Sequence, residues 1–238
     1  MDVRVAQGDI TQWEADVVVV NLFEGVTAPG GGTGAMDAAL GGMISSLIAQ
    51  GDIKGKAGEL TLLHTFGKVP AARVAVAGLG KSKDFDLDAV RNLSANLARS
   101  LRRPGIKSIA TIAHGAGIGG LDPAGSAQAI AEGALMGAYK FTRHKGTNGK
   151  EDEKPEIESL TIVEADHATV GAMVEGAARG VIHGEATNFV RDLANEPSNH
   201  LTPTDLAERA GTMAAEAGLE FRVYEREEMA AKGMGSVL

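Results

Sequence analysis

Two glycine-rich segments are the parts of this sequence whose composition could bind an anionic ligand. They are Pro29–Gly34 and Gly115–Gly120. Glycine lets the backbone approach a ligand closely, and backbone amides at the start of a helix can donate hydrogen bonds to phosphate oxygens. Both segments are therefore candidates for a phosphate or nucleotide site, and each has to be judged by the elements around it.

Gly115–Gly120 satisfies the dinucleotide-binding pattern G-x-G-x-x-G and follows an expected strand at Ser108–Ala113. Leu121–Pro123 intervene before the next helix, so the helix amides would not lie directly under a pyrophosphate. The next segment is a helix followed by a polar loop, and no acidic residue follows at the end of a next strand. We interpret this segment as a glycine-rich connection rather than a nicotinamide or flavin site.

The titratable residues form no recognisable catalytic or metal-binding pattern. The histidines are His64, His114, His144, His167, His183 and His200. None has the spacing of a metal-ligand motif, and we expect surface or hydrogen-bonded structural roles for them. Asp192 and Glu196, paired with Arg191, are expected to be capping and ion-pair groups at the domain junction. Glu225, Glu227 and Glu228 are expected to form a solvated helix face. The sequence therefore predicts no catalytic residue and no metal ligand within these 238 residues.

Strand-like and helix-like segments alternate through the first two thirds of the chain. The expected strands are 17–20, 60–63, 73–77, 108–113 and 160–163, and the expected helices are 36–47, 87–101 and 127–139. Val17–Val20 is a continuous β-branched run, which is typical of a strand covered on both faces. The pattern predicts a three-layer αβα fold with a mixed sheet, and the polar stretch 142–159 is expected to be an exposed loop.

A longer helix is predicted over 168–194, and Asn195–Pro197 should end it because proline lacks an amide donor. After it we expect a short helix capped by Thr202 or Thr204, a strand at Leu219–Val223 and a helix at Glu225–Lys232. One helix, one strand and one helix cannot enclose a core, so this second α/β domain is expected to be incomplete. The predicted organisation is a first domain 1–165, a connector helix 166–197 and a truncated domain 198–238.

Composition limits the classes of partner and location. The formal net charge of −8 argues against broad nucleic-acid binding, and the absence of cysteine excludes disulfides and thiolate metal sites. No apolar run is long enough to span a bilayer, and the amino terminus lacks the pattern of a secretory signal. We therefore expect a cytoplasmic protein that binds neither membranes nor nucleic acid.

Several motifs resemble, in order along the chain, those of leucyl aminopeptidases of peptidase family M17. The segment Asn188–Pro203 contains the family's Arg-Asp-Leu, Asn, Pro, Asn and Leu-Thr-Pro steps. The other similar segments are Gly51–Glu59, Val76–Lys81, Gly137–Phe141 and Gly233–Ser236. The resemblance covers nearly the whole chain, and it implies a first domain with a macrodomain-like fold.

The resemblance also implies a two-domain exopeptidase that releases amino-terminal residues from peptides and forms a homo-oligomer, a hexamer in the family. Its two divalent metals, zinc or manganese, would be held in the second domain by a lysine and by carboxylates. Some of these belong to an Asn-Thr-Asp-Ala-Glu-Gly-Arg motif, which does not occur in residues 1–238. We therefore expect the catalytic motifs to lie beyond Leu238. This part alone should be inactive, without a cofactor, and should serve packing, assembly and active-site access.

An alternative function comes from a resemblance to macrodomains, which bind ADP-ribose. In that family an aspartate corresponding to Asp9 contacts adenine, and a glycine-rich loop corresponding to Gly30, Gly31 and Gly32 wraps the phosphates. The family's asparagine pair falls on Val20 and Phe23. Asn21 is one residue out of register and should point to the other face of its strand. Binding of ADP-ribose or a related nucleotide is therefore the alternative to a part in an aminopeptidase.

Overall fold

The computed structural model describes residues 1–103, 105–116, 119–144 and 156–238. The chain forms two compact units, Met1–Asn188 and Phe189–Leu238, and the division falls inside a single long helix. The predicted domain limits of 1–165, 166–197 and 198–238 remain a prediction. Most of the polar stretch expected to be a loop, and two positions of the segment Gly115–Gly120, lie outside the described residues.

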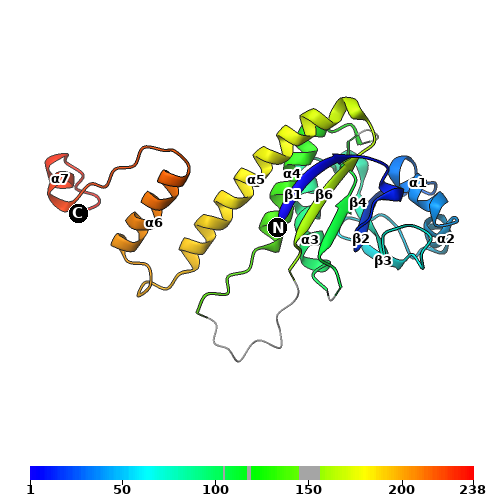
Figure 1. The fold of residues 1–238 in the computed structure, drawn as a ribbon, viewed down its shortest axis with the longest axis horizontal. Helices are drawn as coiled ribbons and strands as arrows, with labels where there is room; N and C mark the ends of the chain where they lie inside the picture. Colours follow the sequence, from blue (N-terminus) through cyan, green and yellow to red (C-terminus); the bar gives the residue numbers. More distant parts are fainter. Residues whose placement is uncertain (104, 117–118, 145–155) are drawn as a thin grey trace. The chain divides into compact units, whose positions relative to one another are not determined.

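The first unit is built on a six-stranded sheet with the order β1-β6-β5-β2-β4-β3 (Figure 1). Its strands are β1 (Asp2–Gln7), β2 (Val17–Phe23), β3 (Leu60–His64), β4 (Arg73–Gly80), β5 (Ser108–Thr111) and β6 (Ser159–Glu164). All neighbours are parallel except β3, which pairs antiparallel with β4. The sheet is therefore mixed, as predicted. Strand β1 was missed from the sequence, although Val3 and Val5 alternate with polar residues.

Helices cover both faces of this sheet. They are α1 (Gly31–Ala39), α2 (Met43–Gln50), α3 (Leu87–Ser100), α4 (Pro123–Ala138) and α5 (His167–Asn195), with short 3-10 turns η1 (Ile10–Gln12) and η2 (Ser82–Asp84). Val17 and Val19 of β2 face the core formed with α3, α4 and α5. Val18 and Val20 face the core formed with α1 and α2. This alternation confirms the three-layer arrangement.

The single helix predicted over 36–47 is wrong, because the chain forms α1 and α2 there. Gly41 and Gly42 both have positive φ angles, 73° and 79°, which interrupt a right-handed helix. The buried Asp37 carboxylate stabilises the first turn of α2: its Oδ1 accepts hydrogen bonds from the backbone amides of Ile44 (2.7 Å) and Ser45 (3.0 Å). The apolar spacing alone could not distinguish one helix from two.

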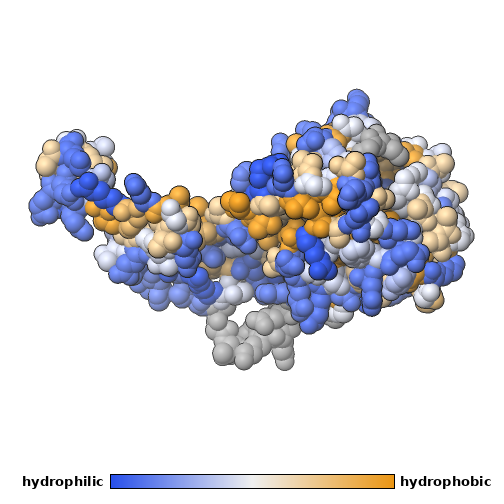
Figure 2. All heavy atoms as spheres, turned by 45° about the horizontal axis from the view of Figure 1, so that its top comes forward, coloured by the Kyte–Doolittle hydropathy of each residue, from blue (hydrophilic) through white to orange (hydrophobic). Residues whose placement is uncertain are grey.

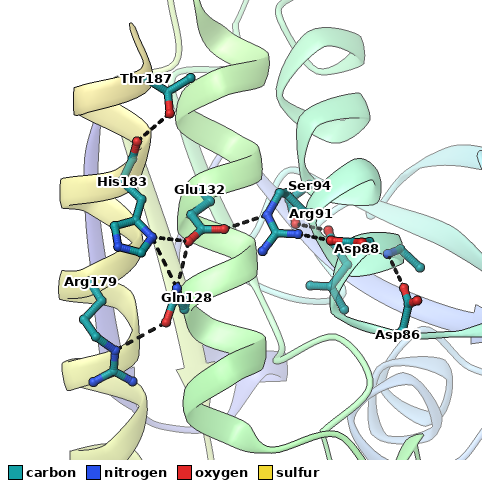
Figure 3. A network of polar contacts seen from close by, with 11 residues as sticks. Asp86, Asp88, Arg91, Ser94, Gln128, Glu132, Arg179, His183 and Thr187 are labelled. Atoms are coloured by element: carbon teal, nitrogen blue, oxygen red, sulfur yellow. Dashed lines mark hydrogen bonds and ion pairs between the residues drawn. The ribbon is translucent and has the colours of Figure 1, made fainter. Parts of the chain in front are cut away.

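Helices α3, α4 and α5 pack at close range through glycine. A Cβ added at Gly133 of α4 would lie 2.1 Å from the carbonyl oxygen of Arg91 in α3. A Cβ at Gly176 of α5 would lie 2.1 Å from the carbonyl oxygen of Ala124 in α4. Figure 3 shows α4 between the other two helices. At these two glycines the helices meet backbone against backbone, and there is no room for a larger side chain.

The second unit contains helices α6 (Pro203–Glu216) and α7 (Arg226–Ala231). Thr202 is the N-cap of α6 and forms a reciprocal capping box with Asp205. Thr202 is one of the two caps that the sequence indicated. The strand predicted at Leu219–Val223 is wrong: this segment has no regular secondary structure, is solvent-exposed and pairs with no strand. Ala214 is the only buried residue of 189–238. None of the helices in the described ranges is long and apolar enough to cross a membrane.

Candidate functional site

The first unit has a cleft of about 920 Å³ where the parallel strands β1, β2, β5 and β6 end. Its walls are the residues that follow these strands, together with the amino-terminal turn of α1. In sheets with helices on both faces, ligands commonly bind beyond the carboxyl ends of the strands. The cleft is therefore the candidate functional site of the first unit.

Asp9, Gly30, Gly31 and Gly32, the residues of the alternative sequence prediction, all line this cleft. The Asp9 Oδ1 atom accepts hydrogen bonds from the Thr11 backbone amide (2.9 Å) and the Thr11 hydroxyl (2.8 Å), which fixes the carboxylate at the start of η1. Gly30 caps α1 without a side-chain hydrogen bond. The N-cap residue therefore offers no side-chain acceptor to the amides of the first turn of α1, whose glycines line the cleft.

Asn21 also lines the cleft, and it is held by a histidine that the sequence did not identify as part of the site. The Asn21 Nδ2 atom lies 3.0 Å from Nδ1 of His114, and Nε2 of His114 lies 3.4 Å from the Thr111 hydroxyl oxygen. Thr111 can donate its proton to the carbonyl oxygen of Ile112, 3.1 Å away. This network fits a neutral imidazole with its proton on Nε2, so that Nδ1 accepts from Asn21.

His114 is 1% exposed, and burial lowers the pKa of its imidazole to about 4. The ring is therefore neutral at physiological pH, and it keeps the Asn21 amide group turned with its NH₂ towards the core. The backbone of Asn21 is held by Thr33, whose hydroxyl donates to the backbone carbonyl oxygen of Asn21 at 2.6 Å. Asn21 thus occupies a fixed position on the face of β2 opposite to Val20, as predicted.

The cleft has an acidic and partly aromatic lining. Asp9, Glu164 and Asp166 contribute carboxyl groups, and no Lys or Arg is present among its lining residues in the described ranges. Phe23 forms part of the wall and meets Phe85 edge to face, with ring centroids 5.2 Å apart. Backbone amides, one amide side chain and an aromatic ring can bind and orient a ligand. No pair of nucleophile and base was found in this lining.

A second polar cluster joins the three helices of one sheet face (Figure 3). The buried Glu132 of α4 accepts from Arg91 Nε (2.6 Å), contacts His183 Nδ1 (2.8 Å) and accepts from Gln128 Nε2 (2.8 Å). Burial alone would raise the pKa of Glu132, but the hydrogen bonds from Gln128, Arg91 and His183 outweigh it and lower the pKa. We interpret this cluster as a structural contact between α3, α4 and α5.

The remaining titratable groups give no further site. Glu196 forms an ion pair with Arg209 in the second unit, with Oε1 3.2 Å from Nη1, whereas the sequence indicated Arg191 as the partner. Within residues 1–103, 105–116, 119–144 and 156–238, no three His, Asp or Glu side chains are grouped so that they could hold a metal ion. The described residues therefore do not fit a two-metal centre.

Comparison with known proteins gives a family for both units. The model of the cytosol aminopeptidase family's N-terminal domain matches residues 19–148, and that of the family's catalytic domain matches residues 188–238. The probable cytosol aminopeptidase of Alkaliphilus metalliredigens is 34% identical over the whole chain, which covers 47% of that protein. The one from Solibacter usitatus is 38% identical, with 45% of its length covered. The chain thus spans about half the length of these relatives.

Solved structures show the same fold. The bottromycin maturation enzyme BotP, 25% identical, superposes with a TM-score of 0.67 over 91% of this chain and 41% of that enzyme. A tomato leucine aminopeptidase variant, 24% identical, has a TM-score of 0.68 over 91% of this chain and 42% of its own. A macrodomain from Oceanobacillus iheyensis, 14% identical, has a TM-score of 0.55 over 73% of this chain and 89% of its own.

The macrodomain likeness confirms the predicted fold of the first unit, and the family models confirm the resemblance carried by the motifs. The N-terminal domain match alone extends over more than half of the chain. Both matches occur in the order in which the family has its domains. The chain therefore belongs to the cytosol aminopeptidase family, peptidase family M17, and comprises its N-terminal domain and the start of its catalytic domain.

Proposed function

We propose that this chain is the amino-terminal part of an aminopeptidase that releases amino-terminal residues from peptides. The observation that carries the proposal is the ordered match to both domains of one family. The structure of the relative BotP has been solved in complex with manganese. The name cytosol aminopeptidase, borne by the relatives, supports a cytoplasmic location for the whole protein.

In this proposal the two metals and the catalytic groups are held by segments outside residues 1–238. Two metals in such an enzyme would bind the free amine, polarise the scissile carbonyl and generate hydroxide near neutral pH. The described residues offer no donor set for them. The part of the protein seen here would instead supply packing, assembly and the walls that control access to the active site.

An activity comparison tests this division. The purified 238-residue chain should hydrolyse leucine anilides no faster with zinc or manganese than with a chelator. A chimera that continues residue 238 with the remaining catalytic domain of the Alkaliphilus metalliredigens relative should gain metal-dependent hydrolysis. Metal-dependent turnover by the short chain, or an inactive chimera that unfolds cooperatively and is therefore folded, would count against the proposal.

A second candidate function is nucleotide binding in the cleft of the first unit. Two observations support it: Asp9 and the glycines of α1 lie in one cleft, and a structurally similar macrodomain from Trypanosoma brucei was solved in complex with ADP. We propose that such binding is weak at most. Val20 is buried on the other face of β2, Phe23 has no hydrogen-bonding group, and the cleft's three carboxylates repel a diphosphate.

Calorimetric titration with ADP-ribose tests the second candidate. We expect no heat of binding, or a dissociation constant well above the micromolar range. The matched variant is Asp9→Ala, which removes the carboxylate but leaves the glycines of α1 in place. Low-micromolar binding that Asp9→Ala abolishes would reverse our ranking of the two functions, whereas binding unchanged by Asp9→Ala would place the ligand outside this cleft.

A further inference from the structure

Two side chains that line the cleft of the first unit have hydrogen-bond acceptors without a partner among the described residues. Asp9 uses only its Oδ1 atom, which accepts from the amide and the hydroxyl of Thr11, so its Oδ2 atom has no donor. The Asn21 amide is oriented by His114: its Nδ2 atom lies against the imidazole, and its Oδ1 atom makes no hydrogen bond. These two oxygens are therefore available to a hydrogen-bond donor in the cleft.

The charge of the lining favours a donor that is also a cation. Glu164 and Asp166 add two further carboxylates, each of which uses one oxygen for a backbone amide. Among the described lining residues there is no Lys or Arg to balance them. A cation lowers the repulsion among these carboxylates, whereas an anion adds to it. An ammonium group, which has a positive charge and several N–H donors, is the complement of this part of the cleft.

The cleft also contains groups that suit a negative charge, where α1 begins. Gly30, Gly31 and Gly32 line the cleft, and Gly30 as N-cap has no side chain to accept from the amides of the first turn. These amides have no acceptor within the helix, and the helix dipole adds partial positive charge there. A single carboxylate is a group that a helix start of this kind can bind. The cleft is thus complementary to both charges of a zwitterion.

Much of the remaining lining is apolar. Ile10, Phe23, Val26 and Ile112 belong to it, and they can cover an aliphatic side chain of a ligand. The same mixture is visible on the surface in Figure 2, where hydrophobic residues reach solvent in patches bordered by hydrophilic ones. The cleft volume of about 920 Å³ is at the upper end of the range for sites of drug-sized ligands, so it accommodates more than one amino acid.

We propose that this cleft binds short peptides that have a free amino terminus and an apolar first side chain. The ammonium group meets Asp9 and Asn21, the side chain meets the apolar lining, and the carboxylate of a dipeptide meets the first turn of α1. The cleft holds the peptide without cleaving it, because its described lining has no pair of nucleophile and base. The choice of peptides rests on the proposed function, since an aminopeptidase takes in and releases chains of this kind.

NMR titration of the 238-residue chain with the dipeptide leucyl-leucine tests this site. A chelator keeps traces of host metallopeptidase inactive, so that binding is measured without turnover. We expect saturable shifts of the Gly31 and Gly32 amide signals, with a dissociation constant of about 1 mM or tighter. N-acetyl-leucyl-leucine lacks the ammonium group and leucyl-leucinamide lacks the carboxylate. Each should bind about tenfold more weakly than leucyl-leucine.

Asp9→Asn is the matched variant. It keeps the Oδ1 acceptor for Thr11, so the local structure is retained, but it replaces the Oδ2 acceptor with an NH₂ donor and removes the charge. The dissociation constant for leucyl-leucine should rise about tenfold. Asp52→Asn makes the same chemical change at an exposed position outside the lining, and it should leave the dissociation constant as in the parent.

Three results would overturn the proposal: no saturable shift with leucyl-leucine, equal affinities in Asp9→Asn and Asp52→Asn, or an acetylated peptide that binds as tightly as the free one. Displacement of the dipeptide by micromolar ADP-ribose would also overturn it, because the cleft would then be a nucleotide site. These results are separate from the activity of the chimera. An active chimera whose cleft binds no peptide removes this site alone, and an inactive chimera removes the proposed function while binding is still measured independently.

Discussion

At the scale of single residues, the buried histidine behind the cleft has consequences for stability. His114 is neutral in the folded protein, with a pKa of about 4, against an ordinary value near 6.5. Between these two values the unfolded chain binds a proton that the folded chain does not. Stability is therefore fully present above about pH 6.5, decreases as the pH falls towards 4, and loses nothing further from this group below that.

We predict that the free energy of unfolding decreases by about 3 kcal/mol between pH 6.5 and 4 through this one group. Urea denaturation at several pH values measures it, with His114→Gln as the comparison. The variant should be less stable at neutral pH but should lose less stability on acidification. Asp16 and Glu132 also have lowered pKa values. Their contributions to the free energy of unfolding are lost only as the pH falls below the ordinary pKa of a carboxyl group. Equal pH slopes in parent and variant would contradict the prediction.

At the scale of secondary-structure elements, the close contact between α4 and α5 depends on glycine, which has no Cβ atom. Alanine is normally a better helix former than glycine by about 1 kcal/mol. At Gly176 that gain is opposed by the carbonyl oxygen of Ala124, which an added methyl group would approach to 2.1 Å. At Gly171, in the same helix, an added methyl group would have no atom within 4 Å.

The two glycines therefore predict opposite effects of the same substitution. Gly176→Ala should lower the free energy of unfolding by about 1–3 kcal/mol, because α5 has to move away from α4. Gly171→Ala should raise it by up to about 1 kcal/mol. Chemical denaturation of both variants beside the parent gives the comparison. If Gly176→Ala were as stable as Gly171→Ala, the backbone contact would not be as close as described.

The elements that could be predicted from the sequence are those whose apolar pattern shows which of their faces must be buried. Val17–Val20 is apolar at every position and needs cover on both faces, and helices packed on each side of the sheet provide it. Leu219–Val223 alternates like a strand but has no neighbouring strand to bond. Its β-propensity alone is therefore not enough to form a strand. The break at Gly41–Gly42 required φ angles that apolar spacing does not encode.

The candidate site was predictable only in part, for a related reason. Asp9 and the glycines at 30–32 could be identified from local motifs, and the parallel strands then bring them to one edge. The contact between Asn21 and His114 spans 93 residues and depends on β2 pairing with β5. No local pattern marks either residue. A histidine at the end of a predicted strand was visible, but its partner was not.

At the scale of the whole molecule, the two units differ in how much of each is buried. The first has two cores, whereas Ala214 is the only buried residue of the second. We predict that limited proteolysis first cuts between Ala194 and Thr204, where α5 has ended and α6 begins. A carboxyl-terminal tag should be released before any peptide from α3 or α4 appears by mass spectrometry. Tag release that is as slow as cleavage in those helices would refute this.

The pairing of β1 with β6 sets an order of events during synthesis. Asp2 is bonded in register with Ser159, and Gln7 with Glu164, so the first strand made needs the last strand of the sheet. On a ribosome adding about 5–20 residues per second, β1 waits roughly 8–30 s for its partner to be made. Strand β2 waits less, because its partner β4 follows it much sooner in the chain. The amino terminus is thus the first part of the sheet to be translated and the last to be incorporated.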